Sequence, residues 1–201
     1  MEPNPRKATS IRRLGRVDIG ALREAVLALP ESVWDAENEA KPNRFGALDR
    51  TRHIIFRFVS NFHDWRGSYA KPIWNEWAPL LQPVLDAATK DYGYARGAYP
   101  RVMLARMPAG GEIKPHRDQN PAAKWPHKIH VPIQTSDRVT FFVDGAGYHF
   151  GEGEAVEVNN MAVHAVTNAS SSDRIHLIFE YYDLDQPEPA WLAEVQRRFA
   201  S

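Results

Sequence analysis

The chain of 201 residues contains no cysteine. Disulfide frameworks, thiolate zinc sites and cysteine nucleophiles are therefore excluded, and any metal ligands must come from histidine, aspartate or glutamate. A chain without thiols is compatible with a reducing compartment, so we expect a cytoplasmic protein.

The chain also lacks an excess of either charge, because 25 lysine and arginine residues balance 25 aspartate and glutamate residues. A nucleic-acid partner would favour a basic excess or stripe. No apolar run is long enough to span a bilayer, and the polar N-terminus has no apolar stretch of the secretory kind. We therefore expect no nucleic acid and no membrane as partners, and a small-molecule substrate. Nothing in the sequence indicates an oligomeric state.

The length suits one domain with a full hydrophobic core. We expect a flexible tail over residues 1–10 and a single domain over 11–201. Within that domain the pattern predicts a helical N-terminal part over 11–97, a strand-rich core over 98–183 and a C-terminal helix over 189–199.

Two helices and one strand are predicted in the N-terminal part. Asp18 can cap a helix that runs to about Leu29, and Ile54–Val59 has the composition of a strand. Over Pro72–Tyr92 apolar residues recur at spacings of three and four, which predicts a helix with one core-facing side. Pro79 and Pro83 lie inside this region and predict a kink or a break.

Short strands and turns alternate after Pro100. The turn Asp144-Gly145 predicts a hairpin, and many short strands with turns are typical of a sandwich or barrel. The predicted strands are Arg101–Met107, Lys128–Thr135, Arg138–Asp144, Tyr148–Phe150, Ala155–Asn159, His164–Asn168 and Arg174–Asp183. The fold class is therefore mainly β with flanking helices.

Three residues form a candidate metal site. His116 and Asp118 are one residue apart, and on a strand this spacing directs both side chains to the same face. His164, on a later strand, would complete two imidazoles and one carboxylate. Such a triad leaves coordination positions open, as non-haem iron(II) oxygenases require, whereas a structural zinc site is closed by four ligands.

A candidate anion site follows ten residues after His164. The planar fork of Arg174 suits a carboxylate, although an arginine in a surface ion pair would look the same in sequence. From Arg174 to Tyr181 polar and apolar residues alternate, so one face of this strand can pack in the core while the other lines a polar cavity. A solvent-facing polar side would give the same pattern.

Several spaced blocks together resemble the aspartyl/asparaginyl β-hydroxylase family over about residues 98–183. Because Asp118 is present, the closest resemblance is to the bacterial hydroxylases of free amino acids, of the proline type. The blocks are Gly110–Asp118, His130–Ile133, Phe141–Gly145, Gly153-Glu154, Asn159-Asn160, His164–Val166, Asn168 and Asp173–Ile178.

The resemblance implies a double-stranded β-helix (jelly roll, cupin-like) with Fe(2+), 2-oxoglutarate and O2. It implies iron on His116, Asp118 and His164, the distal carboxylate of 2-oxoglutarate on Arg174, and His130 as a further co-substrate contact. The reaction it implies is hydroxylation of a small substrate with release of succinate and CO2. No catalytic side chain is expected beyond the metal centre.

Candidate substrate contacts are Lys128, Arg117, Trp125 and His176. Lys128 stands where relatives often have an arginine that engages the substrate. Trp125 belongs to the loop 119–126, which is either a lid or an ordinary surface loop. The remaining histidines outside the resemblance, His53, His63 and His149, are expected to be structural or exposed.

Alternatives remain at the level of the substrate and of the class. The substrate is expected to be a free amino acid, with an Asp or Asn side chain in a peptide or an acyl chain of a lipid as alternatives. A zinc hydrolase could use the same three ligands with Glu112 as its base. A non-catalytic metal-binding jelly-roll module, such as a sensor or a carbohydrate-binding module, would not need Arg174.

Overall fold

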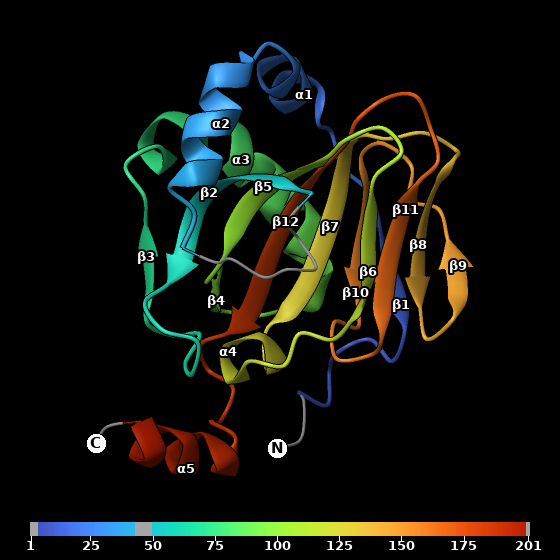
Figure 1. Cartoon of the computed structure of the whole chain (residues 1–201). Coiled ribbons are helices and arrows are strands. Elements are labelled where there is room, and N and C mark those ends of the chain that lie inside the picture. The colour runs from blue at the N-terminus through green and yellow to red at the C-terminus, as the bar shows by residue number, and fades with distance from the viewer. Residues whose placement is uncertain (1–3, 43–49, 200–201) are drawn as a thin grey trace.

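The computed structural model describes residues 4–42 and 50–199, whose strands form two sheets that face each other (Figure 1). The larger sheet has eight strands in the order β1 (Ile11–Arg16), β10 (Glu154–Val158), β7 (His127–Gln134), β12 (Arg174–Asp183), β5 (Val102–Met107), β2 (Arg52–Val59) and β3 (Ser68–Ala70), with β4 (Gly97–Ala98) beside β12. The smaller sheet has the order β6 (Glu112–His116), β11 (His164–Asn168), β8 (Val139–Val143) and β9 (Ala146–Tyr148).

From β5 onward the chain passes back and forth between the two sheets. Strands β5, β7, β10 and β12 lie in the larger sheet, and β6, β8, β9 and β11 lie in the smaller one, with every pairing antiparallel. This alternation is a double-stranded β-helix, so the predicted jelly-roll fold class is confirmed.

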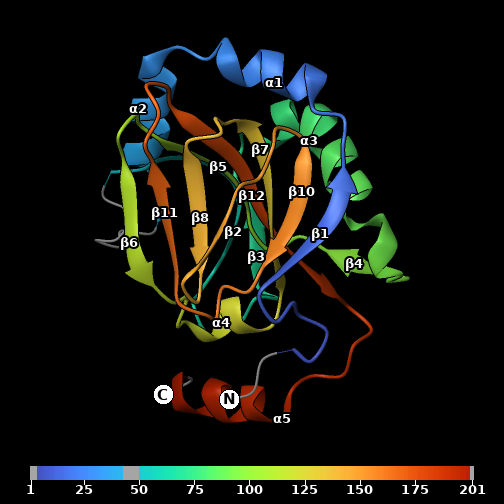
Figure 2. The same ribbon diagram turned by 90° about the vertical axis from the view of Figure 1, so that its right-hand side faces the viewer.

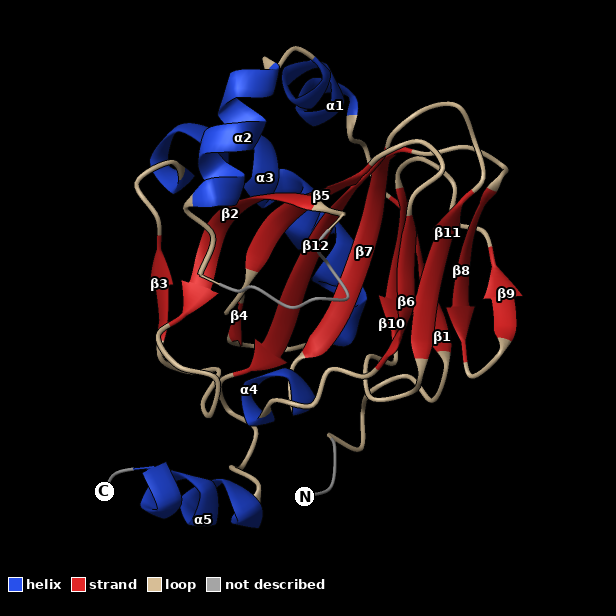
Figure 3. Ribbon diagram, viewed as in Figure 1, coloured by secondary structure: helices blue, strands red, loops and turns tan. Residues whose placement is uncertain are grey.

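Helices flank the sheets (Figure 3). α3 (Trp74–Thr89), continued by a 3-10 turn (Lys90–Tyr92), lies against the face of the larger sheet that is turned away from the smaller sheet, and α1 (Gly20–Leu27) crosses one end (Figure 2). α2 (Glu31–Glu39), α4 (Pro121–Lys124) and α5 (Ala190–Phe199) complete the set in the described chain. The main core lies between the helices and the larger sheet, which leaves the sheet's other face available for a cavity.

α3 runs unbroken through Pro79 and Pro83, so the helix is not split at the prolines. The two prolines are four residues apart and lie on the exposed side of the helix. Water can bind the carbonyls that the missing N–H groups leave there. The opposite side packs Leu81, Val84 and Leu85 into the core, which keeps the helix continuous.

The helical N-terminal part predicted for 11–97 is wrong in its composition, since β1, β2 and β3 lie within it and β4 begins at its last residue. β1 pairs with β10 at the edge of the larger sheet. Its half-buried residues Ile11 and Leu14 are three apart, and a bulge falls next to Gly15, which has a φ of 101°. The alternation that normally marks a strand is therefore missing from the sequence.

The flexible tail predicted for 1–10 is wrong over residues 4–10; residues 1–3 lie outside the described residues. Asn4, Lys7 and Ala8 are buried. The backbone N–H of Ala8 donates to the buried carboxylate of Glu157, 3.0 Å away, which ties this segment to β10. Short polar segments become ordered when such buried partners receive them.

The predicted hairpin turn is confirmed. Asp144 and Gly145 join β8 to β9 with φ values of 47° and 83°. Positive φ at both central residues is the geometry that favours an Asp-Gly pair in a two-residue hairpin. In the described chain, the helices are all too short or too polar to cross a bilayer.

Candidate metal centre and adjoining cavity

The structure brings His116, Asp118 and His164 together, with one potential ligand atom from each within 4.8 Å of the others. His116 ends β6 and stands directly opposite His164, the first residue of β11. Asp118 lies just beyond the strand, where its backbone N–H donates to the carbonyl of Asn160 over 3.0 Å. The cross-strand pairing brings the two histidines together, and this single hydrogen bond holds Asp118 beside them.

Both imidazoles are held by backbone carbonyls. Nδ1 of His116 lies 2.8 Å from the carbonyl of Lys114, and Nδ1 of His164 lies 3.0 Å from the carbonyl of Ala162. A carbonyl only accepts, so each Nδ1 carries the proton and each Nε2 presents a lone pair. Burial lowers the pKa of His164, which favours the neutral ring that a metal requires.

The carboxylate of Asp118 is held by two donors on the same oxygen. Nζ of Lys128 lies 2.7 Å and Nδ2 of Asn160 lies 3.1 Å from its Oδ2. Burial raises the pKa of Asp118, but Lys128, His164 and Asn160 outweigh it and hold the pKa below the ordinary value. The group is therefore an anion with its other oxygen, Oδ1, 4.0 Å from Nε2 of His116.

Asn160 connects this carboxylate to the N-terminal segment. It is fully buried, and its Nδ2 also donates to the carbonyl of Ala123 over 2.9 Å. Its Oδ1 accepts from Nζ of Lys7 over 2.6 Å. Burial lowers the pKa of Lys7 to about 8, partly offset by nearby carboxylates.

Replacing Asn160 by alanine is expected to weaken metal affinity about 10- to 100-fold, as for other groups that orient a ligand. The cause is that Asp118 loses one donor and Lys7 loses its side-chain acceptor. Metal affinity would be measured by anaerobic titration. The neighbouring Asn159→Ala, whose side chain binds the backbone of Thr9 and Met161, is the control. Equal affinities in the two variants would refute the positioning role of Asn160.

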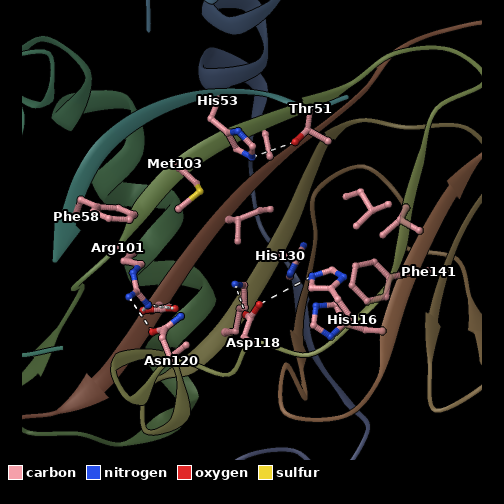
Figure 4. Close-up of a pocket in the computed structure, with 18 of the residues that line it drawn as sticks. Thr51, His53, Phe58, Arg101, Met103, His116, Asp118, Asn120, His130 and Phe141 are labelled. Atoms are coloured by element: carbon pink, nitrogen blue, oxygen red, sulfur yellow. Dashed lines mark hydrogen bonds and ion pairs between the residues drawn. The ribbon is translucent and has the colours of Figure 1, made fainter. Parts of the chain in front are cut away.

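A cavity adjoins the three candidate ligands between the two sheets (Figure 4). Its lining includes Arg174, which is 1% exposed. In the described chain no carboxylate lies within ion-pair distance of this guanidinium; one nitrogen donates to Nδ1 of His176 over 2.6 Å, and Nε has no partner. Burial lowers the pKa of Arg174 to about 9, so the side chain is still a cation at neutral pH. A buried cation without an anion is costly unless a ligand supplies the anion.

His130 also lines the cavity, as the sequence led us to expect for a co-substrate contact. Its ring packs edge-on against Phe141, and its buried Nδ1 has no partner among the described residues. Burial, followed by Arg174 and Lys128, lowers the pKa of His130 well below the ordinary value. The ring is therefore neutral and keeps hydrogen-bonding capacity for a molecule in the cavity.

Of the four expected substrate contacts, one lines the cavity. Lys128 does so, but its ammonium is bound to Asp118. Arg117 is exposed and lies outside the cavity lining. Trp125 stacks on Trp65 in a separate apolar cluster, and His176 lies behind Arg174 as its acceptor.

The structure adds cavity residues that the sequence did not identify: Thr51, His53, Arg101, Asn120 and Glu180. His53 was expected to be structural or exposed, yet it is 3% exposed and lines the cavity. Two of them had a signal: Glu180 shares the polar face of β12 with Arg174, and Asn120 lies in the loop that follows Asp118. Thr51, His53 and Arg101 come from segments whose approach to β12 depends on the tertiary fold.

His53 gives the protein a defined sensitivity to acid. Burial, with a contribution from Lys41, lowers its pKa from 6.5 to about 3. The unfolded chain then takes up a proton near pH 6.5 while the folded chain does not, so stability present above that pH is lost as pH falls. Wild type carries this loss and His53→Gln does not. We therefore expect the unfolding free energy of wild type to fall relative to that of His53→Gln by ~2 kcal/mol between pH 6.5 and 5, at about 1.4 kcal/mol per pH unit. Urea unfolding at both pH values tests this, and a constant difference would contradict it.

The zinc hydrolase alternative needs Glu112 near the metal. Glu112 is exposed and lies at the opposite end of β6 from His116, paired across the sheet with Thr167. It is absent from the cavity lining. The base that this alternative requires is therefore not at the site.

Several solved structures have the same architecture. A 2OG-Fe(II) oxygenase family oxidoreductase from Burkholderia pseudomallei is 14% identical, with 90% of this chain and 94% of that chain covered and a TM-score of 0.53. A prolyl-4-hydroxylase from Pseudomonas putida is 15% identical, with 87% and 94% covered and a TM-score of 0.51. The carbocyclase SnoK from nogalamycin biosynthesis, described as non-heme and alpha ketoglutarate dependent, is 13% identical, with 88% and 80% covered and a TM-score of 0.54. At these identities the likeness concerns the fold.

Fold and donor set are those of the 2-oxoglutarate-dependent non-haem iron dioxygenases, which use Fe(2+), 2-oxoglutarate and O2, and a family match places the chain in this class. The profile of the Aspartyl/Asparaginyl beta-hydroxylase family matches residues 79–183. The chain belongs to this family, as its sequence blocks predicted. No curated protein matches the chain.

Proposed function

We propose that the chain hydroxylates a free amino acid, with iron(II) bound by His116, Asp118 and His164. Arg174 receives the distal carboxylate of 2-oxoglutarate, and His130 is a further contact. One observation carries this proposal: the buried, uncompensated cation of Arg174 shares a cavity with two oriented imidazoles and an ionised carboxylate.

The residues present fit both absent groups. Two Nε2 lone pairs and one carboxylate oxygen form the donor set of the facial triad, which leaves positions open for ligands that are not protein. Arg174 offers a fork that matches a carboxylate, and that carboxylate would supply the missing anion. A purely structural metal site would explain neither the open positions nor the arginine.

When bound, iron(II) and 2-oxoglutarate supply the oxidising chemistry, inserting one oxygen atom of O2 into a substrate C–H bond and leaving succinate and CO2. The protein's part is positioning. The carbonyls of Lys114 and Ala162 fix the two rings, and Lys128 keeps Asp118 ionised and in place. Apolar residues of the smaller sheet that line the cavity, Ile113, Phe141 and Val166, limit the entry of water.

A free amino acid is supported by the retained carboxylate ligand Asp118, a feature of the amino acid hydroxylases that the sequence resembles. A second candidate is an Asp or Asn side chain within a peptide, which the description of the family favours. The two candidates differ in whether the substrate's ammonium and carboxylate groups are free.

The test is succinate formation under air by protein loaded with iron(II) under anaerobic conditions. Substrates would be the standard amino acids singly, and peptides that contain an internal Asp or Asn. Iron-dependent succinate that rises with one amino acid, together with a product that gains one oxygen atom by mass spectrometry, supports the proposal. Stimulation by the peptides alone would replace it with the second candidate. Absence of any iron-dependent turnover of 2-oxoglutarate would refute both.

A further inference from the structure

A second ion pair, besides that of Lys128 with Asp118, lines the same cavity away from Arg174. Glu180 shares the polar face of β12, and Arg101 lies just before β5. Nη1 of Arg101 donates to both carboxylate oxygens of Glu180 over 2.8 Å each, and the two residues are 5% and 2% exposed. Nη2 of Arg101 donates to Oδ1 of Asn120 over 3.3 Å.

This pair lies close to the metal ligands. Asn120 follows Asp118 by two residues, and Glu180 stands directly across the sheet from Lys128, which binds Asp118. Figure 4 shows Arg101 and Asn120 together at one side of the cavity, with Asp118 between them and His116. A molecule held by the pair would therefore lie beside the metal centre.

Burying two charges costs free energy, and well-packed apolar residues often serve the fold equally well. Here the pair faces a cavity, and it retains capacity for a ligand. A guanidinium has five N–H donors, and each oxygen of Glu180 has a second lone pair. An ion pair of this kind presents a donor fork for a carboxylate next to an acceptor for an ammonium group.

The wall beside the pair is apolar. Phe58, Met103 and Ile178 line the same cavity, and the guanidinium of Arg101 lies 5.4 Å from the centre of the Phe58 ring. Lys128, the cation nearest to the ligands, is already bound to Asp118, and Arg174 is assigned to 2-oxoglutarate in the proposed function. Among the other described lining residues no unengaged charge is left for an acidic or basic substrate side chain.

We propose that Arg101 binds the α-carboxylate and Glu180 the α-ammonium of a free amino acid whose side chain is aliphatic. This inference rests on the proposed function and narrows it. The head group is fixed at the ion pair, and the aliphatic carbon atoms extend along Met103 and Ile178 toward the metal. Aspartate and asparagine would be poor substrates in spite of the name of the family.

The first test is equilibrium binding to wild-type protein. The protein would be loaded with iron(II) and 2-oxoglutarate and kept free of oxygen, so that calorimetry measures binding without turnover. The probes are L-proline, L-leucine and L-isoleucine, the N-acetyl and methyl ester forms of each, and L-aspartate. We expect at least one aliphatic amino acid to bind, and each blocked form to bind about 10- to 100-fold more weakly, the value of one charge-assisted hydrogen bond.

The second test uses Arg101→Lys and Glu180→Gln, with Arg106→Lys as the matched control. Arg106 lies on β5 and is paired with Glu31 and Asp173 outside this cavity. The two cavity variants are expected to lose amino acid affinity by a similar factor, with affinity for 2-oxoglutarate unchanged. In Glu180→Gln the N-acetyl form should no longer be discriminated against, a selectivity change that a merely structural pair would not produce.

The outcomes separate the two proposals. Blocked forms that bind as well as the free amino acid, or variants that lose thermal stability without a change in selectivity, would overturn the head-group assignment. L-aspartate binding more tightly than every aliphatic probe would overturn the aliphatic assignment. Failure of 2-oxoglutarate itself to bind wild-type protein would instead refute the proposed function.

Discussion

Alanine in place of His116 is expected to abolish both iron binding and iron-dependent succinate formation. Two protein ligands would remain, Asp118 and His164, and one of these is an oxygen ligand whose second oxygen is already bound by Lys128 and Asn160. The cluster contains only these three side chains among the described residues, and the remaining coordination positions are open. No other side chain of the cluster can therefore replace the lost imidazole.

Iron per chain after anaerobic loading, and succinate from 2-oxoglutarate, are the two measurements. His149→Ala is the matched control, since that ring is exposed and bonds the carbonyl of Val139 instead of lying in the cluster. His116→Ala protein that still holds one iron per chain and produces succinate at the control rate would show that the metal lies elsewhere.

The second large effect concerns Arg174, for which leucine removes the charge and keeps an apolar stem. Affinity for 2-oxoglutarate is expected to fall by about 2–5 kcal/mol, roughly thirtyfold to four-thousandfold, because a buried carboxylate would lose its partner. Affinity for 2-oxobutanoate, which lacks the distal carboxylate, should be nearly unchanged. The ratio of the two affinities therefore isolates the contact.

The same substitution is expected to stabilise the ligand-free protein, although it lowers the affinity for 2-oxoglutarate. The ligand-free protein carries Arg174 as a buried cation without an anion, so Arg174→Leu is expected to raise its melting temperature. Arg106→Leu is the control, since it removes a guanidinium that is ion-paired outside the cavity. A variant that loses stability and keeps its preference for 2-oxoglutarate over 2-oxobutanoate would contradict the assignment of Arg174 to the distal carboxylate.

The strands of the core were predictable because their burial follows a period that the sequence displays. β11 and β12 have the predicted bounds, and the alternation of β12 correctly separated a core face from a cavity face. The edge strand β1 was not predictable, because only every third residue is partly buried and a bulge shifts its register. Residues at the edge of a sheet take their conformation from a partner strand that is distant in sequence.

The cavity was predictable only where a motif spans neighbouring residues. The spacing of His116 and Asp118 and the position of Arg174 are local signals, and the structure gathers these residues at one site. His53 and Arg101 carry no such signal, because their approach to β12 depends on how β2 and β5 pair in the larger sheet. The expectation that Trp125 contacts the substrate was wrong. Its neighbours in sequence lie near the site, but its ring packs against Trp65.

The link from Lys7 through Asn160 to Asp118 has a consequence for how the enzyme must be handled. Nζ of Lys7 binds the carbonyl of Pro126 over 2.7 Å as well as Asn160, so this segment supports the position of Asp118, a proposed metal ligand more than a hundred residues away. Proteolytic removal of the residues up to Lys7 would retain every strand of the jelly roll and yet weaken iron binding. Preparations that differ in N-terminal integrity should therefore differ in metal content before they differ in folding.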